Sequence, residues 1–338
     1  MTFFQSESLL NFPYDSKRKP VLARNIVATS QPLAAQAGLD MLRRGGNAVD
    51  AALAAAIALT VVEPTGNGIG SDAFALIWDG RKLHGLNGSG RSPSGWSPNR
   101  FAACDSMPEL GWDSVTVPGA VDAWSRLSQR FGQLPFARLF EPAIGYAEQG
   151  FLVTPAVASI WAEAPERFQG YEEFAKTFLP GGRPPAVGEP FACPQQAETL
   201  RKIAATDGQT FYRSQLAERI AAQAAAGGSA LTLQDLAEHT SEWVTPQAHL
   251  QMIVRIFDYG LNPQTASDAP RWYVAEDFRL ALESGLPDNL AAELAERGHR
   301  LMPDPPTRLF GGAQLTACLP DGYCGASDHR KDGQAVGF

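Results

Sequence analysis

The stretch of sequence that decides the fold is residues 38–70, GLDMLRRGGNAVDAALAAAIALTVVEPTGNGIG. Its first part completes a helix predicted over residues 31–44, where apolar side chains recur at helical spacing. The pair Gly45-Gly46 ends this helix, because glycine adopts the left-handed backbone of a helix end without steric cost. The rest of the stretch must therefore form a separate element.

That element is predicted to be a buried helix over residues 48 to about 61. Asn47 can cap its start, and Asp50 favours the same end because the helix dipole is positive there. Almost every residue is Ala, Leu, Ile or Val, and a helix that is apolar on every side is buried. Glu63-Pro64 stops the helix, and residues 65–72 form a flexible polar loop.

Downstream of this loop the pattern indicates a mixed chain of helices and strands, of class α/β or α+β. Residues 74–79 are a short apolar run that suits a buried strand, and residues 82–86 suit the strand returning from the Asp79-Gly80 turn. Residues 121–228 are mainly helical in pattern. Beyond residue 247 we predict helices over residues 249–259, from Asn262 and over 289–297, and strands over residues 278–282, 313–319, 322–325 and 335–338.

Composition limits the partners and the compartment. The 338 residues suffice for one large unit or two ordinary domains, and a formal net charge of −8 argues against nucleic-acid or anionic-membrane partners. The cysteines form no Cys-x-x-Cys motif and are interpreted as reduced thiols, with a disulfide between Cys318 and Cys324 as the weaker alternative. No signal peptide or membrane span is recognisable, so the cytoplasm is the expected compartment.

Three collinear blocks carry a family signature. The first is residues 38–70, the second is residues 114–151 with the motif VPGAVDAW, and the third is residues 258–272 with the motif DYGLNPQ. Residues 325–337 echo the third block. Spread over most of the chain, these blocks resemble the γ-glutamyltransferase (γ-glutamyltranspeptidase) family, in its γ-glutamyltransferase-like branch.

This resemblance implies a fold and a reaction. The fold is the αββα sandwich of the N-terminal-nucleophile hydrolases. Residues 1–246 resemble a helix-rich large-subunit region and residues 247–338 the C-terminal part of a small subunit, together one αββα-type unit. Family members cut their own precursor, and the threonine thereby exposed attacks a γ-glutamyl amide with its own α-amino group as base. The acyl group then passes to water, an amino acid or a peptide.

The part of the family pattern that holds this chemistry is missing from the chain. Family members place the threonine, several strands and an oxyanion-hole glycine pair between segments that resemble residues 233–243 and 249–252. Here Pro246 is followed directly by Gln247. We therefore expect an incomplete central sheet and no catalytic residue in this chain.

Three hydroxyl residues near this join are candidate substitutes for the threonine. Thr240, Ser241 and Thr245 are not followed by the histidine and apolar residues that accompany the nucleophile in the resembled family. Helix capping or a turn explains all three residues better than catalysis.

Three other residues are candidates for substrate binding. Arg91 lies in a loop where classical family members place an arginine that grips the substrate α-carboxylate, which a guanidinium matches bidentately. Its spacing from Pro93 differs from theirs, so a surface arginine in a Gly-rich turn is an equal alternative. Ser71 and Asp72 either line the same site or cap the strand that follows, and capping is the preferred interpretation.

The remaining polar motifs favour structure over chemistry. Asp328, His329 and Arg330 are interpreted as structural pairing beside a strand, and His249 as a packed histidine on an amphipathic helix. The sequence holds no Gly-x-Ser-x-Gly elbow, phosphate-binding loop or His-Glu-x-x-His motif. We expect neither a cofactor nor a metal ion.

Three hypotheses for function follow. The chain is a γ-glutamyltransferase or glutathione hydrolase acting on a small γ-glutamyl compound, with activity impaired by the missing threonine segment. Alternatively, it is a catalytically inactive relative that serves as a binding or interaction module, or an internally deleted chain without native activity. A homodimer is the assembly we consider.

Overall fold

The computed structural model describes residues 18–244, 252, 254–275 and 278–338. The chain divides into two compact units. Unit 1 combines Met1–Ala35, Thr154–Ala156 and His249–Phe338, and unit 2 combines Gln36–Val153 and Val157–Ala248. Unit 1 thus joins the beginning of the chain to its end. The division at residue 246 into large- and small-subunit-like regions stays a prediction.

The helix pair predicted around the glycine doublet is confirmed. α1 is Pro32–Arg43 and α2 is Ala48–Val62, and Gly45 between them has a φ of +86°. The Asn47 side chain accepts a hydrogen bond from the Asp50 amide, and the Asp50 carboxylate accepts one from the Asn47 amide. This reciprocal capping fixes where α2 begins. Most of α2 is buried, as its composition predicts.

Unit 2 contains an antiparallel sheet in the order β3-β4-β7. β3 is Ala73–Trp78, β4 is Leu83–Gly88 and β7 is Glu242–Val244, and α3 (Ala120–Phe131) packs against β3 and β4. β3 and β4 form the hairpin predicted around Asp79-Gly80. β7 was not predicted, because three residues are too few to show a strand's alternation.

The prediction that β3 is a buried strand is wrong. Phe74, Leu76 and Trp78 are 69%, 52% and 63% exposed, whereas the intervening Ala75 and Ile77 are partly buried. Successive side chains of a strand point to opposite faces of the sheet, and only the face of β3 that carries Ala75 and Ile77 is covered. An unbroken apolar run has the same pattern whether one face or both are covered.

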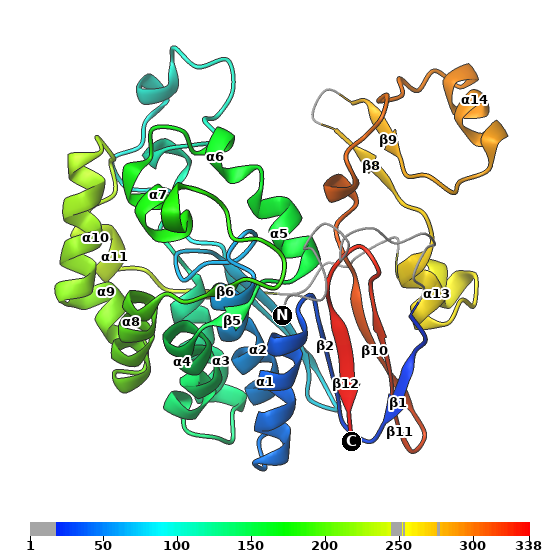
Figure 1. The fold of residues 1–338 in the computed structure, drawn as a ribbon, viewed down its shortest axis with the longest axis horizontal. Helices are drawn as coiled ribbons and strands as arrows, with labels where there is room; N and C mark the ends of the chain where they lie inside the picture. Colours follow the sequence, from blue (N-terminus) through cyan, green and yellow to red (C-terminus); the bar gives the residue numbers. More distant parts are fainter. Residues whose placement is uncertain (1–17, 245–251, 253, 276–277) are drawn as a thin grey trace, which may run out of the picture. The chain divides into compact units, whose positions relative to one another are not determined.

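The region predicted to be mainly helical, residues 121–228, and the segment just after it hold the remaining helices that the structure describes in unit 2, and β5 (Phe151–Leu152) pairs with β6 (Pro190–Phe191) among them. These helices are α4 (Glu141–Gln149), α5 (Pro155–Trp161), α6 (Ala164–Arg167), α7 (Glu172–Phe178), α8 (Pro194–Ala205), α9 (Gln209–Arg213), α10 (Gln215–Ala226) and α11 (Leu233–Ala237). α2 packs against α4 and α4 against α8, which places α2 inside the unit (Figure 1).

Unit 1 is built on strands from both ends of the described chain. β2 (Ile26–Thr29) pairs antiparallel with β12 (Gln334–Gly337). β1 (Val21–Ala23) joins the hairpin of β10 (Gln314–Leu319) and β11 (Gly322–Ser327) in the order β1-β11-β10, so blue and red strands lie side by side in Figure 1. The three late strands confirm the prediction, whereas β1 and β2 were not predicted.

The other elements of unit 1 are short. Asn262 caps α13 (Pro263–Asp268) as predicted, and α14 is Asp288–Glu296. β8 (Trp272–Val274) pairs with β9 (Leu280–Leu282). The amphipathic helix expected over residues 249–259 begins outside the described residues, and its described part, Val254–Asp258, is a π-helical turn.

The fold is a mixture of helices and strands, as predicted, and its described strands form sheets of two or three members. All four cysteines are free thiols, so Cys318 and Cys324 form no disulfide. Within the described ranges, no helix combines the length and the apolar character that crossing a membrane requires.

Candidate functional site

Two glycine-containing segments of unit 2 meet backbone to backbone. The Val117 amide donates a hydrogen bond to the Arg91 carbonyl oxygen, at 2.9 Å. A Cβ on Gly90, whose φ is +74°, would lie 1.8 Å from the Val117 carbonyl oxygen, and one on Gly119 would lie 2.0 Å from the Gly88 carbonyl oxygen. Only glycine fits at these contacts. The motif VPGAVDAW therefore supplies the base on which the Arg91 loop rests.

Ser71 contacts the same base from another direction. Its carbonyl oxygen accepts hydrogen bonds from the amides of Gly119 and Ala120, at 3.2 and 2.9 Å, at the start of α3. Ser71 is partly buried and Asp72, directly before β3, is exposed. The structure thus brings Ser71 and Arg91 to one segment of backbone, while substrate binding by Ser71 and Asp72 stays a prediction.

The Arg91 side chain is paired with a carboxylate of this chain. Its guanidinium lies 3.2 Å from a carboxylate oxygen of Glu238, just after α11, and both side chains are about half exposed, at 48% and 53%. Hydrogen bonds from Gln234 and then Arg91 lower the pKa of Glu238 below its ordinary value. Arg91 is therefore accessible and already oriented toward an anionic group.

The segment after Glu238 does not cap a helix or form a turn, which corrects that interpretation of Thr240 and Ser241. It is an extended connection from α11 to β7, in which the Thr240 hydroxyl accepts a hydrogen bond from the Arg126 guanidinium. The Ser241 hydroxyl is buried, has no hydrogen-bond partner in the described part of the chain, and faces the backbone of Gly88. The Thr240 hydroxyl is thus engaged by Arg126 and the Ser241 hydroxyl is inaccessible, and Thr245 lies outside the described residues.

Asp122 anchors this connection, and sequence reasoning missed it. Its carboxylate accepts hydrogen bonds from the Ser241 amide at 2.6 Å and from the Arg126 guanidinium at 3.0 Å. The Tyr212 hydroxyl accepts a bond from the Asp122 amide and donates one to the Pro118 carbonyl oxygen. Asp122 belongs to the motif VPGAVDAW, so its place in a family block was the available signal.

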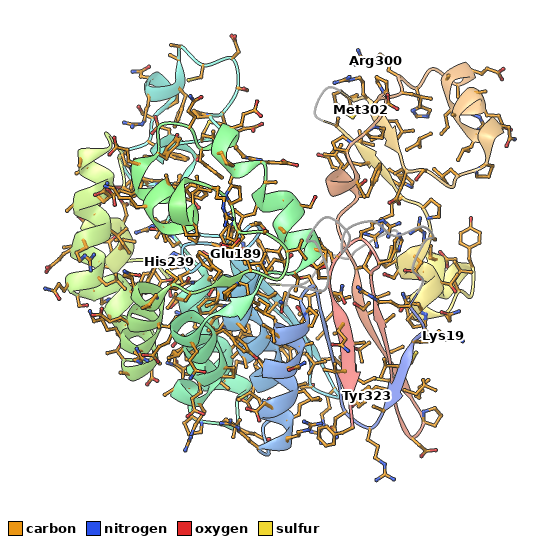
Figure 2. The ribbon with its side chains drawn as sticks, viewed as in Figure 1. Lys19, Glu189, His239, Arg300, Met302 and Tyr323 are labelled. Carbon is orange, nitrogen blue, oxygen red and sulfur yellow. The ribbon has the colours of Figure 1, made fainter. Side chains whose placement is uncertain are left out.

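His239 completes this polar cluster inside the helical part of unit 2 (Figure 2). Its ring stacks on that of Tyr212, with 5.5 Å between ring centroids. Burial lowers the pKa of His239; Asp122 opposes this shift, and the charges of Arg91 and Arg126 add to it. A neutral imidazole follows at physiological pH.

The cluster at residues 328–330 belongs to unit 1 and is structural, as predicted. The buried Asp328 carboxylate accepts hydrogen bonds from the Arg271 and Arg330 guanidinium groups, and Arg330 also binds Glu283 at 2.6 Å. His329 is more exposed, with its Nδ1 atom 3.0 Å from Asp268. His249 lies outside the described residues. Within the described ranges, no cluster of three or more His, Cys, Asp or Glu side chains could hold a metal ion.

Comparison with solved structures defines the class of protein. A cephalosporin acylase from Bacillus halodurans superimposes with a TM-score of 0.90 at 29% identity, covering 100% of this chain and 99% of that chain. A γ-glutamyltranspeptidase from Pseudomonas nitroreducens, in complex with L-DON, has a TM-score of 0.61 at 26% identity and covers 82% of this chain and 75% of that chain. The fold is therefore that of the N-terminal-nucleophile hydrolases.

The family model described as gamma-glutamyltranspeptidase matches residues 34–247 and again residues 245–338. The chain belongs to the γ-glutamyltranspeptidase family. Curated relatives include a glutathione hydrolase-like YwrD proenzyme of Bacillus subtilis, 34% identical over 66% of this chain and 43% of the relative. An oxamate amidohydrolase proenzyme of Klebsiella pneumoniae is 39% identical over 61% and 40%. The chain thus spans less than half the length of the curated relatives it matches.

Proposed function

We propose that this chain binds γ-glutamyl amides of the glutathione type but does not turn them over by itself. The family reaction is transfer or hydrolysis of the γ-glutamyl group through an N-terminal threonine. The observation that carries the proposal is the adjoining of the two family matches at residues 245–247, in a chain that spans less than half of its curated relatives. Family members carry the segment with the threonine at this position, and the chain lacks that segment.

We assign the substrate α-carboxylate to Arg91. Its accessible guanidinium and its pairing with Glu238 support this role, because a substrate carboxylate can replace a surface carboxylate that is only half buried. Its loop also rests on the motif VPGAVDAW and lies beside the end of the large-subunit-like region. Ser71 and Asp72 are assigned to the margin of the same site.

A second candidate function is hydrolysis of a different amide. It is favoured by the end-to-end similarity to the cephalosporin acylase, whose name specifies another class of substrate. That similarity also supports a folded chain of this extent, which speaks against the hypothesis of an internally deleted chain without native activity.

The purified chain should bind glutathione in a calorimetric titration, yet release p-nitroaniline from γ-glutamyl-p-nitroanilide no faster than buffer does. Arg91→Gln should weaken glutathione binding about tenfold or more, because a charge-assisted hydrogen bond contributes about 1.5–3 kcal/mol. Arg138→Gln is the matched control, since this exposed arginine is also paired with a carboxylate, that of Glu141.

Each result decides one part of the proposal. Chromophore release above the buffer rate would show that the chain is catalytic. Equal affinity of wild-type protein and Arg91→Gln would remove Arg91 from the site. Hydrolysis of a cephalosporin or of oxamate, without glutathione binding, would establish the second candidate instead.

We also propose a cytoplasmic location and a homodimer. The four free thiols support a reducing compartment, because disulfides form and persist mainly in oxidising ones. The exposed apolar side chains of β3 support self-association. Fractionation of the source cells and sedimentation of the purified chain test these two points.

A further inference from the structure

Unit 2 contains a cavity of about 940 Å³ that has no part in the proposed γ-glutamyl site. Its volume lies within the usual range of small-molecule pockets, about 300–1,000 Å³. Arg91, Ser71 and Asp72 are not among the described residues that line it. The cavity is therefore a separate candidate binding site.

One wall of the cavity is a connected array of aromatic rings. The rings of Phe168 and Phe174 have centroids 4.3 Å apart, and those of Phe174 and Phe178 are 5.1 Å apart. Behind them the buried Trp161 packs against Phe178 and donates its indole N–H to the Phe178 carbonyl oxygen, at 2.9 Å. The wall is thus formed before any ligand arrives, and it suits an apolar or aromatic group.

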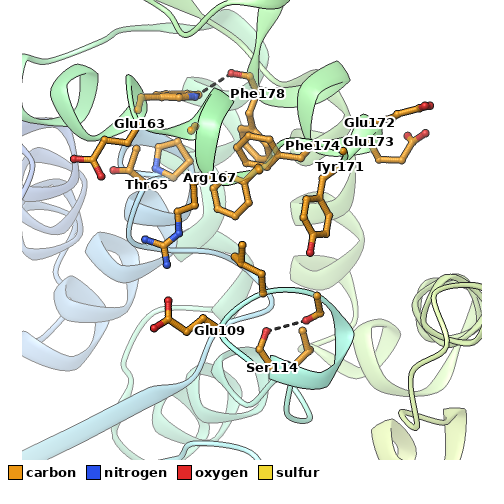
Figure 3. A pocket seen from close by; sticks show the side chains of 18 of the residues that line it. Thr65, Glu109, Ser114, Glu163, Arg167, Tyr171, Glu172, Glu173, Phe174 and Phe178 are labelled. Atoms are coloured by element: carbon orange, nitrogen blue, oxygen red, sulfur yellow. Dashed lines mark hydrogen bonds between the residues drawn. The ribbon is translucent and has the colours of Figure 1, made fainter. Parts of the chain in front are cut away.

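Two opposite charges face the open space beside this wall. Arg167, at the end of α6, and Glu109 both line the cavity, and Figure 3 shows the Glu109 carboxylate below the Arg167 guanidinium, with the two charged ends turned toward each other in this view. Neither side chain forms an ion pair with another residue in the described part of the chain. By contrast, the charge of Glu173 is balanced by Lys176 at 2.6 Å.

We propose that the cavity binds a small zwitterion with an apolar side chain, that is, a free aromatic or aliphatic α-amino acid. Its carboxylate pairs with Arg167, its ammonium group with Glu109, and its side chain lies on the aromatic wall. A ligand with only a carboxylate would leave Glu109 next to a like charge, and one with only an amine would leave Arg167 next to one. The proposal does not depend on γ-glutamyl binding at Arg91.

Calorimetric titration of the whole chain with three ligands that share one ring tests the proposal. L-phenylalanine should bind about tenfold or more tightly than 3-phenylpropanoate or 2-phenylethylamine, since each of these lacks one charge-assisted contact. Arg167→Gln should remove the advantage of L-phenylalanine over the amine, and Glu109→Gln its advantage over the carboxylate.

Arg183→Gln is the matched control, because Arg183 is an exposed arginine paired with Glu189 that does not line the cavity. Its affinity for L-phenylalanine should equal that of the wild type. Both test residues are exposed, so the thermal transition of each variant should match the wild type and confirm an intact fold. Equal affinities for the three ligands, absence of saturation up to the solubility limit of L-phenylalanine, or unchanged binding by Arg167→Gln would each overturn the proposal.

Discussion

Asp328 shows how a sequence motif that invites a catalytic interpretation serves the structure instead. It is completely buried, and its carboxylate accepts hydrogen bonds from the Ala313 amide at 2.7 Å and from Arg330 at 3.0 Å, besides that from Arg271. The sequence shows that Asp328 and Arg330 are near neighbours. It could not show that Arg271, far earlier in the chain, neutralises the Asp328 carboxylate. Such partners come from tertiary packing alone.

Asp328→Asn should destabilise the protein by about 3–5 kcal/mol, because it leaves the buried Arg271 guanidinium without its carboxylate and Arg330 with Glu283 alone. Denaturant unfolding followed by circular dichroism measures the change. Asp321→Asn, at an exposed turn residue between β10 and β11, is the control and should stay within about 0.5 kcal/mol of wild type. Similar midpoints for the two variants would show that the network contributes little.

The effect of Asp328→Asn should also depend on pH. Burial acts to raise the pKa of Asp328, but hydrogen bonds from the Ala313 and Arg330 amides and the charges of Arg271 and Arg330 outweigh it and hold the pKa below the ordinary 3.8. The carboxylate therefore stabilises the fold above that value, and the stabilisation disappears as the pH falls through the lower, folded-state pKa. The stability difference between wild type and Asp328→Asn should narrow below about pH 4, and a constant difference would contradict this.

At the scale of elements, local signals predicted what local physics determines. The Gly45-Gly46 stop and the Asn47 cap are decided within a few residues, so α1 and α2 were placed almost to the residue. β1, β2 and β7 have three or four residues and exist because of partners distant in the chain, so their own sequences gave no signal. The sequence shows the Gly-rich Arg91 loop as a motif, but it does not show that the backbone of this loop packs against Gly119.

Two glycine substitutions should have opposite effects. Gly90→Ala should destabilise the protein by more than about 1 kcal/mol, because φ is +74° and the added methyl group would overlap the Val117 carbonyl oxygen. Gly145→Ala, inside α4 with no heavy atom near its added Cβ, should stabilise by about 0.5–1 kcal/mol. Thermal unfolding of the two variants checks the signs, and a tolerated Gly90→Ala would mean that the loop relaxes readily.

For the whole molecule, the three blocks were enough to indicate the family, and the family match confirms it. What the sequence could not give was the grouping of residues near the start of the chain with those after 249 in one unit. Nor could it show the aromatic cavity, since its lining comes from segments more than one hundred residues apart, from Pro64 to Gln223. Each of these features depends on how distant segments fold together.

The purified chain should stay in one piece. Autoproteolysis in the resembled family requires the threonine segment, so a denaturing gel should show one band near 36.3 kDa after prolonged incubation. If the primary amines of the incubated protein are chemically labelled before denaturation, mass spectrometry should find a labelled α-amino group only at the original N-terminus and none at an internal residue. Two fragments that accumulate without added protease would prove that a residue of this chain can cleave its own backbone.

The outer face of β3 has a practical consequence. A strand that offers Phe74, Leu76 and Trp78 to water at the rim of its sheet is a ready template for a neighbouring molecule. We expect the protein concentration, rather than the temperature, to determine how soon the protein aggregates. Storage at low concentration, or the substitution Leu76→Lys, should keep the protein in solution without changing its buried core.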